Sequence, residues 1–294
     1  MPRRLSLSLD AVIVAVTAGE PRILTTTQPG DGIPALPSGP LDAEVDATLD
    51  LGLRRWIAAQ TGLAVGYVEQ LYTFGDRDRS RDAGNSRHLS VGYLGLVKEA
   101  QPAPGAAWLD FYAILPWEDR RGRNAAALGR KLAAALDRWA GRDAARQRRV
   151  VVNFGGRGAW DPIRVLERYE LLYEAQLVPE YESDRGLPPV SRPEFGTELA
   201  YDHRRIAATA LGRLRGKLKY RPVVFELLPE TFTLLQLQKT VEALTGIRLH
   251  KQNFRRLVAS GRFVEPTRTL ERPARGRPAK LFRFRREVVR ARLY

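Results

Sequence analysis

Hydrophobic and polar residues alternate in the first part of the chain, and their spacing then changes. The segment 5–16 alternates before it becomes continuously apolar, and 22–27 follows after a turn, so both predict β-strands. From Glu44 to Gly62 the apolar positions recur at helical spacing, which predicts a helix that ends at this glycine. The apolar face of that helix would carry Val45, Leu49, Leu53, Trp56 and Ile57.

The middle of the chain mixes both kinds of element. Strands are predicted at 67–74, 89–97, 109–115 and 150–154, and helices at 124–139 and 162–177. Strands and helices mixed with short connections indicate an α+β or α/β first domain. Residues 183–198 are dense in Pro and Gly, which is typical of an interdomain linker. We therefore divide the chain into a first domain at 1–182, the linker 183–198 and a second domain at 199–294.

The second domain shows the element order of a winged helix-turn-helix. Thr233 and Gln236 have the spacing of a capping box, in which each side chain bonds the other's backbone N–H, and the helix they begin would end at Gly246. Helices are predicted at 203–217, 233–245 and 249–260, and strands at 262–265 and 281–284. Two helices joined by a Gly-containing turn and followed by a β-ribbon predict a DNA-binding fold of this type.

Charge is distributed unevenly between the two domains. The chain has 48 Lys and Arg against 33 Asp and Glu, a formal net charge of +15. Residues 201–294 alone carry +16, whereas residues 1–200 carry −1. A domain this basic attracts polyanions, because counterions released from nucleic acid supply much of the binding free energy. The charge points to the second domain as the nucleic-acid-binding part, and the alternative is a merely solvated basic surface.

The last predicted helix carries the residue types that read DNA. Phe254, Leu257 and Val258 form its predicted inward stripe. Arg pairs with guanine, Asn and Gln with adenine and Lys with phosphate, and an Arg-rich wing tip suits a narrow minor groove. The predicted contacts to double-stranded DNA are Lys251, Gln252, Asn253, Arg255, Arg256, Arg275, Arg277 and Lys280. RNA binding is an alternative, because Phe282 and Phe284 alternate with arginines.

Composition excludes several kinds of chemistry. The chain has no cysteine, which removes disulfides, thiolate zinc sites and thiol nucleophiles. Its three histidines, His88, His203 and His250, lie too far apart in sequence for a local metal-binding pattern. No apolar run approaches the about 18 residues of a transmembrane helix. We therefore expect a cytoplasmic protein with no membrane partner, no metal and no cofactor.

One segment of the first domain resembles the Nudix box, although it is two residues longer. It runs from Gly39 through the predicted helix to Gly62. In Nudix enzymes an Arg in this box is accompanied by glutamates that hold the divalent cations acting on a pyrophosphate. Arg55 matches the Arg. The glutamate positions fall on Trp56, Ala59 and Gln60, which supply no anionic oxygen. The resemblance therefore implies a Nudix-like domain that is not an enzyme.

A hydrolase remains the alternative. Glu44, Asp46 and Asp50 lie near the start of the predicted helix and could rebuild a metal site. The protein would then be an active Nudix pyrophosphatase acting on ADP-ribose or related nucleotides. The other interpretation is that these carboxylates complement the helix dipole and stay solvated.

The chain also resembles a specific group of Nudix-related proteins. QLYTFGDRDRSRD at 70–82, the segment 199–261 and GRPAKLFRF at 276–284 are similar to the NrtR-type transcriptional regulators of NAD metabolism. Residues 101–198 make the chain longer than the simplest members and closer to the NadQ type. The resemblance implies an α/β/α Nudix-like sandwich followed by a winged helix. It also implies a repressor of NAD biosynthesis or salvage genes, with ADP-ribose, ATP or another NAD-related nucleotide as effector. A homodimer is expected, because one winged helix reads only a few bases and palindromic half-sites match a two-fold axis.

The loop after the strand at 67–74 holds the candidate effector contacts. Arg forks pair bidentately with phosphate, and Gly allows close backbone approach. The candidates are Gly75, Asp76, Arg77, Arg79 and Arg87. The alternative is an exposed loop whose aspartates and arginines neutralise one another. A Gly-rich turn within 153–162, before a helix, could also face a phosphate, but it lacks the Lys and Ser/Thr of a P-loop.

Overall fold

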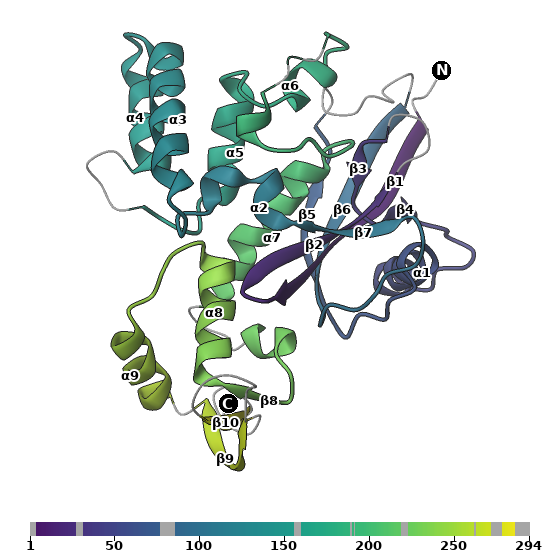
Figure 1. Cartoon of the computed structure of the whole chain (residues 1–294). Helices are drawn as coiled ribbons and strands as arrows, with labels where there is room; N and C mark the ends of the chain where they lie inside the picture. The colour runs from purple at the N-terminus through teal and green to yellow at the C-terminus, as the bar shows by residue number, and fades with distance from the viewer. Residues whose placement is uncertain are drawn as a thin grey trace.

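The computed structural model describes residues 4–27, 32–76, 86–155, 160–188, 190, 192–218, 223–261, 263–271 and 278–285. A seven-stranded sheet lies at the centre of the N-terminal part (Figure 1). Its strands are β1 (Arg4–Thr17), β2 (Glu20–Thr27), β3 (Pro34–Ala35), β4 (Ser38–Pro40), β5 (Tyr67–Phe74), β6 (Ser86–Leu96) and β7 (Ala106–Asp110). The order is β3-β2-β1-β6-β5, with β4 paired to β1 and β7 to β2. β1 and β6 are parallel, and the other pairs are antiparallel.

Alternate side chains of β1 face opposite sides of the sheet, and both sides are covered. Leu9 and Ile13 pack in the cluster that contains Ile57 of α1 (Leu49–Thr61). Val12 belongs to the other cluster, with Leu211 of α7 (His203–Leu218). Figure 1 shows α1 on one side of the sheet and α7 on the other. This arrangement confirms the predicted α+β fold and its α/β/α sandwich.

Helix α1 is shorter at its start than the apolar spacing predicts. The Thr48 hydroxyl accepts a hydrogen bond from the Leu51 N–H and caps the helix, so it begins at Leu49. Val45 therefore lies outside the helix and is exposed, not part of its apolar face. The predicted end is confirmed, because Gly62 adopts the left-handed conformation with φ of 69°.

Short and medium helices fill the region between β7 and α7. They are α2 (Phe111–Ile114), η1 (Pro116–Glu118), α3 (Asn124–Ala140), α4 (Ala144–Phe154), α5 (Val165–Glu174), α6 (Glu180–Ser183) and η2 (Pro193–Phe195). Two predicted strands are wrong here. The strand predicted at 150–154 is instead the last part of α4, a helix that Asp143 caps at its start. The strand predicted at 109–115 stops at Asp110, because this residue caps α2. Among the described helices, none is both long and apolar enough to cross a membrane.

Helix α7 packs with the sheet and with α5, although the sequence assigns it to the basic C-terminal domain. Ile206, Leu211 and Leu214 are fully buried in the core shared with the sheet, so this helix is not a free basic surface. The predicted linker also contributes to the core, because Phe195 is buried in the same cluster. Helix α7 thus packs as part of the N-terminal body. The predicted domain boundaries, 1–182, 183–198 and 199–294, stay a prediction.

The C-terminal elements form the predicted winged helix. They are η3 (Val223–Leu227), β8 (Thr231–Thr233), α8 (Leu234–Thr245), α9 (Lys251–Gly261), β9 (Val264–Glu271) and β10 (Ala279–Phe284). Both halves of the Thr233–Gln236 capping box are present. Strand β8 is not indicated by the sequence pattern; it pairs with β10 and makes the ribbon a three-stranded sheet.

Candidate nucleic-acid and effector sites

A hydrogen-bonded turn fixes the direction of α9 relative to α8. The Glu242 carboxylate, only 6 % exposed, accepts from the Leu249 N–H at 2.9 Å and from the Gln238 amide at 2.9 Å. The same Gln238 amide donates to the Leu249 carbonyl. A carboxylate that accepts from α8 and from the turn before α9 holds this turn in one conformation, so α9 leaves α8 at a defined angle.

Helix α9 exposes the predicted DNA-reading residues. Its single buried side chain is Phe254, and Val258 packs against the same core. Leu257, predicted to face inward, is wrong: it is 68 % exposed and lies on the outer surface. The five predicted contacts on this helix are all exposed: Lys251, Gln252, Asn253, Arg255 and Arg256. Their contact with DNA stays a prediction, but all five are free to face a groove.

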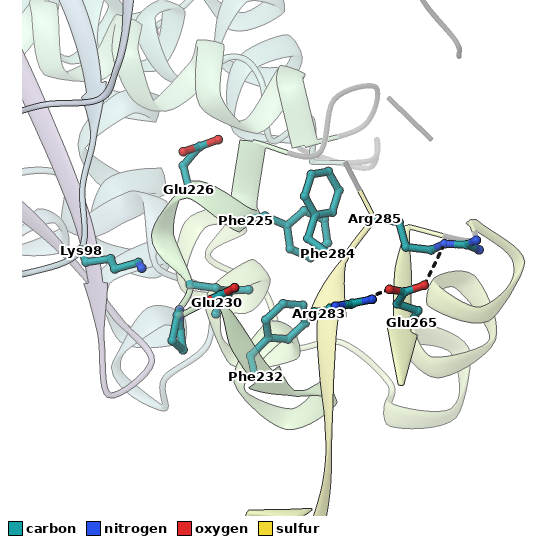
Figure 2. Close-up of a pocket in the computed structure, with 11 residues that line it drawn as sticks. Lys98, Phe225, Glu226, Glu230, Phe232, Glu265, Arg283, Phe284 and Arg285 are labelled. Carbon is teal, nitrogen blue, oxygen red and sulfur yellow. Dashed lines mark hydrogen bonds and ion pairs between the residues drawn. The ribbon is translucent and has the colours of Figure 1, made fainter. Parts of the chain in front are cut away.

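Fewer basic side chains of the ribbon are without an acidic partner than its sequence suggests. Lys280 is exposed on β10, whereas Arg275 and Arg277 lie outside the described residues. Figure 2 shows Arg283 and Arg285 directed at one carboxylate, that of Glu265, with N–O distances of 2.5 and 3.4 Å. Both arginines are thus partly neutralised within the ribbon.

The aromatic residues of the ribbon face the protein. The Phe284 ring stacks on Phe225 with centroids 4.2 Å apart (Figure 2), and Phe282 packs against the core. Phe284 and Phe225 line a cavity of about 650 Å³ that Lys98 reaches from the loop after β6. An exposed aromatic surface, on which unpaired RNA bases would stack, is therefore not provided by Phe282 and Phe284.

In the segment that resembles the Nudix box, neutral side chains of α1 bond to the backbone of β4. The Trp56 indole lies over Gly39, where a Cβ would come within 2.1 Å of the ring, and its N–H donates to the Pro40 carbonyl at 2.9 Å. The Gln60 amide donates to the Ser38 carbonyl at 2.7 Å and accepts from the Ser38 N–H at 3.0 Å. Two of the three glutamate positions thus hold the β4 segment against α1.

The acidic residues near α1 are occupied by arginines. Asp46, 2 % exposed, receives two hydrogen bonds from Arg55 at 2.8 and 2.9 Å, which lower the pKa of its carboxyl group. Asp50 pairs with Arg54, and Glu44 is exposed. Over the residues described, no group of three or more His, Cys, Asp or Glu side chains could hold a metal ion.

The loop at 75–88, which holds the candidate effector contacts and is called the effector loop below, is described only at its two ends. Arg87 donates to the Gly75 carbonyl at 2.6 Å, and Asp76 forms an ion pair with Arg205 of α7 at 2.6 Å. Arg77 and Arg79 lie outside the described residues. Arg87 therefore has a structural contact, and phosphate recognition by this loop stays a prediction.

Arg205 of α7 is a further residue of this site, and the sequence pattern does not indicate it. It also contacts Glu170 and Asp202, so three carboxylates surround one guanidinium. Burial lowers the pKa of Arg205, but the charges of Asp202 and Glu170 outweigh burial and raise it above its ordinary value. The effector loop is therefore linked to α7 by a permanent positive charge, and no local sequence signal joins these segments.

A second missed cluster joins the two parts of the chain. The Glu118 carboxylate is fully buried and pairs with Arg168 at 2.6 Å and with Arg215 of α7. Arg215 also donates to the Leu244 carbonyl at the end of α8. Gly246, with φ of 71°, lies so close that a Cβ would come within 2.1 Å of the Glu118 carbonyl oxygen. We call Glu118, Arg168 and Arg215 the buried joint.

Two further hydrogen bonds cross the same contact. The Tyr112 hydroxyl donates to the Ala243 carbonyl at 2.6 Å, and the Arg120 N–H donates to the Gly246 carbonyl at 2.8 Å. Burial raises the pKa of Tyr112 to about 12, so the hydroxyl remains a donor at neutral pH. The end of α8 is thus attached to the N-terminal body by both charged and neutral groups.

Sequence comparison identifies the C-terminal domain. Residues 224–284 match the family described as the NrtR DNA-binding winged helix domain. A protein of Acinetobacter baylyi named ADPR responsive transcriptional repressor NtrR is 38 % identical over 87 residues, which is 30 % of this chain and 34 % of the relative. The chain thus matches about a third of the length of this curated relative.

Structural comparison extends the likeness to the whole chain. The crystal structure of Shewanella oneidensis NrtR with a 27mer DNA is similar over 97 % of this chain and 95 % of that one, with a TM-score of 0.59 and 22 % identity. A MutT/nudix family protein from Enterococcus faecalis is similar over 96 % and 87 %, with a TM-score of 0.57 and 16 % identity. Residues 224–284 therefore match the NrtR DNA-binding winged helix domain, and the whole chain has the fold of these two solved structures.

Proposed function

We propose that the protein is a DNA-binding transcriptional repressor that acts in the cytoplasm as a homodimer. The observation that carries this proposal is α9, where five polar or basic side chains are exposed on a helix anchored by Phe254. The winged-helix match and the name of the Acinetobacter relative support it. A dimer is expected, because one winged helix reads only a few base pairs and a two-fold pair fits a palindromic operator.

The Nudix-like domain is the sensor in this proposal. Its effector is ADP-ribose or another adenine nucleotide, and the regulated genes belong to NAD biosynthesis or salvage. The Acinetobacter relative is named as ADPR responsive. Helix α7 offers the connection: Arg205 near its start pairs with Asp76 of the effector loop, and Arg215 near its end bonds α8. An effector acts through this helix only if it binds the DNA-competent and incompetent arrangements with different affinities.

In the same proposal the domain binds its nucleotide without cleaving it. Cation-assisted pyrophosphate cleavage needs anionic oxygen ligands. Trp56 and Gln60 use their polar groups on the β4 segment, and Asp46 is paired with Arg55. The alternative, an active pyrophosphatase, predicts release of AMP from ADP-ribose with Mg²⁺ or Mn²⁺, and we expect no turnover above a protein-free control.

Operator binding is tested on the promoter fragments that flank the gene. Fluorescence anisotropy at 150 mM salt should give specific binding that weakens steeply as salt rises. The variant Arg255→Ala/Arg256→Ala should lose at least tenfold in affinity. Arg130→Ala/Lys131→Ala removes the same charge from the exposed side of α3 and should bind as the native protein. Equal losses in both variants, or no preference for any promoter over random DNA, would reject the proposal.

A further inference from the structure

A cavity of about 620 Å³ lies away from the effector loop and the DNA-reading helix, between α3, α4 and η1. In Figure 1, α3 and α4 stand side by side at the edge of the molecule. The volume is in the range of small-molecule sites, which are lined mainly by apolar side chains with few polar groups. The lining includes Leu128, Leu132 and Leu136 of α3 and Val150, Val151 and Phe154 of α4.

Two hydrogen-bond donors in the cavity lining have no partner. The indole N–H groups of Trp117 and Trp160 are buried and bond to nothing in the described structure. Trp117 is 96 % buried. Buried polar groups in proteins nearly always have partners, and both unpaired donors belong to residues that line this cavity, which favours a ligand that reaches them when it binds. Since both are donors, the missing group must be a hydrogen-bond acceptor.

The charge at this end of the cavity is positive. Arg120 lines the cavity, is exposed, and lies 4.6 Å from the Trp160 ring centroid. Among the described residues it has no carboxylate partner, because its neighbour Asp119 is bonded to Arg121 at 2.9 Å. The other acidic residue of the lining, Asp137, lies near the far end of α3, about 20 Å along the helix. A guanidinium that has no carboxylate partner among the described residues, in the same lining as two indole N–H donors, favours a carboxylate.

The walls near Arg120 are aromatic and partly uncovered. Phe154 and Trp160 pack edge to face with ring centroids 6.4 Å apart, and Trp117 lies in the same lining. Val151 is 51 % exposed although it lines the cavity. Such walls suit a flat apolar body. We propose that this cavity binds an aromatic monocarboxylate, with its carboxylate at Arg120 and the indole donors and its ring against α3 and α4.

The position of the cavity gives such a ligand a route to the DNA-binding domain. Trp117 and Arg120 flank Glu118 of the buried joint, and the Arg120 N–H bonds the Gly246 carbonyl at the end of α8. Arg168 of the same joint lies 3.8 Å from the Trp160 ring centroid. A ligand that moves either indole therefore acts on side chains that hold the winged helix. This site would serve as a second effector site, separate from the nucleotide site.

The test uses 2-naphthoate as probe and the full-length protein. The five indole N–H signals are resolved by ¹H–¹⁵N NMR and assigned by Trp→Phe variants. Saturation with 2-naphthoate should shift the signals of Trp117 and Trp160. The signals of Trp56 and Trp108, which donate to backbone carbonyls, should not move. The cation 2-naphthylmethylammonium has the same apolar body and should bind at least tenfold more weakly. Arg120→Gln should remove that preference.

Two matched variants keep the test independent of folding. Ala133→Phe fills the cavity from α3, and Ala134→Phe places the same ring on the neighbouring exposed position, outside the lining. Gly129→Leu is a second filling variant, since a Cβ there meets nothing within 4 Å. Ala133→Phe and Gly129→Leu should abolish the shifts, and Ala134→Phe should keep them. No shift at 5 mM probe, equal shifts in the filled variants, or shifts that depend on protein concentration would overturn the proposal. The last result would instead indicate a second copy of the chain in the cavity.

Discussion

Replacement of Glu118 by Gln tests whether the buried joint stabilises the native structure. The Glu118 carboxylate is completely buried and accepts from two arginines, Arg168 and Arg215, whose side chains are also 0 % exposed. Glu118→Gln keeps the shape but removes the carboxylate that balances both arginines within the described part of the chain. Removing one partner of a buried ion pair costs about 3–5 kcal/mol, since the remaining charge stays buried without compensation. We therefore expect a loss of this size in the free energy of unfolding.

Urea denaturation followed by tryptophan fluorescence and by circular dichroism measures this loss, and coincident transitions justify a two-state treatment. At about 2–4 °C per kcal/mol for a chain of this order of size, the midpoint of thermal unfolding should fall by roughly 6–20 °C. Glu174→Gln is the matched control: its ion pair with Arg149 has side chains 45 % and 46 % exposed. Such surface pairs contribute less than about 1 kcal/mol. Equal losses for Glu118→Gln and Glu174→Gln would refute the reasoning.

Three further predictions follow from the N-terminal body. The pKa of Asp46, measured by ¹³C NMR, should lie below its ordinary value of 3.8 and return toward that value in Arg55→Gln. The pair should then stabilise the fold above pH 4 and lose this effect as pH falls through the lowered pKa. An unshifted pKa in the native protein would disprove the pairing. Gly39→Ala should lower the free energy of unfolding by about 1–3 kcal/mol in chemical denaturation, because its Cβ meets the Trp56 ring. A second change, Trp56→Ala, should recover part of the loss. No recovery would place the strain elsewhere. Asp76→Asn should alter the change in Kd for DNA that ADP-ribose causes at least twofold, as measured by anisotropy, while the Kd without nucleotide stays the same. An unaltered effect of ADP-ribose would argue against α7 as the connection.

Features set by neighbouring residues were predictable from the sequence. The Thr233–Gln236 capping box and the ends of α1 and α8 at Gly62 and Gly246 depend on a few local hydrogen bonds and on the freedom of glycine at positive φ. The continuous apolar run in the second half of β1 predicted a strand, because the sheet buries both of its faces there.

Features decided by tertiary contacts were predicted less well. The run at 150–154 is rich in β-branched residues, yet it is helical because Asp143 caps α4 and the helix packs on α3 and α5. Leu257 was assigned inward by periodicity, but α9 is anchored mainly through Phe254 and leaves it exposed. A period identifies a face of a helix, and only the packing decides how much of that face is covered.

The candidate sites divide in the same way. The exposure of the polar residues of α9 follows from their spacing around Phe254, so this polar surface could be predicted, and its contact with DNA stays a prediction. Glu118 and Arg215, by contrast, are charged residues that a sequence places on the surface, and they become a buried pair only when segments far apart in the chain meet. Arg205 was missed for the same reason, since its partner Asp76 lies on a distant loop.

The central claim is that the winged helix binds DNA under the control of a nucleotide that the Nudix-like domain does not cleave. The most direct measurement is the Kd for operator DNA with and without ADP-ribose in the presence of Mg²⁺, followed by chromatography of the recovered nucleotide. We predict that ADP-ribose changes the Kd at least fivefold, which is a typical allosteric coupling, and that it is recovered intact. An operator bound no more tightly than random DNA, a Kd that ADP-ribose leaves unchanged, or ADP-ribose recovered as AMP would contradict the account.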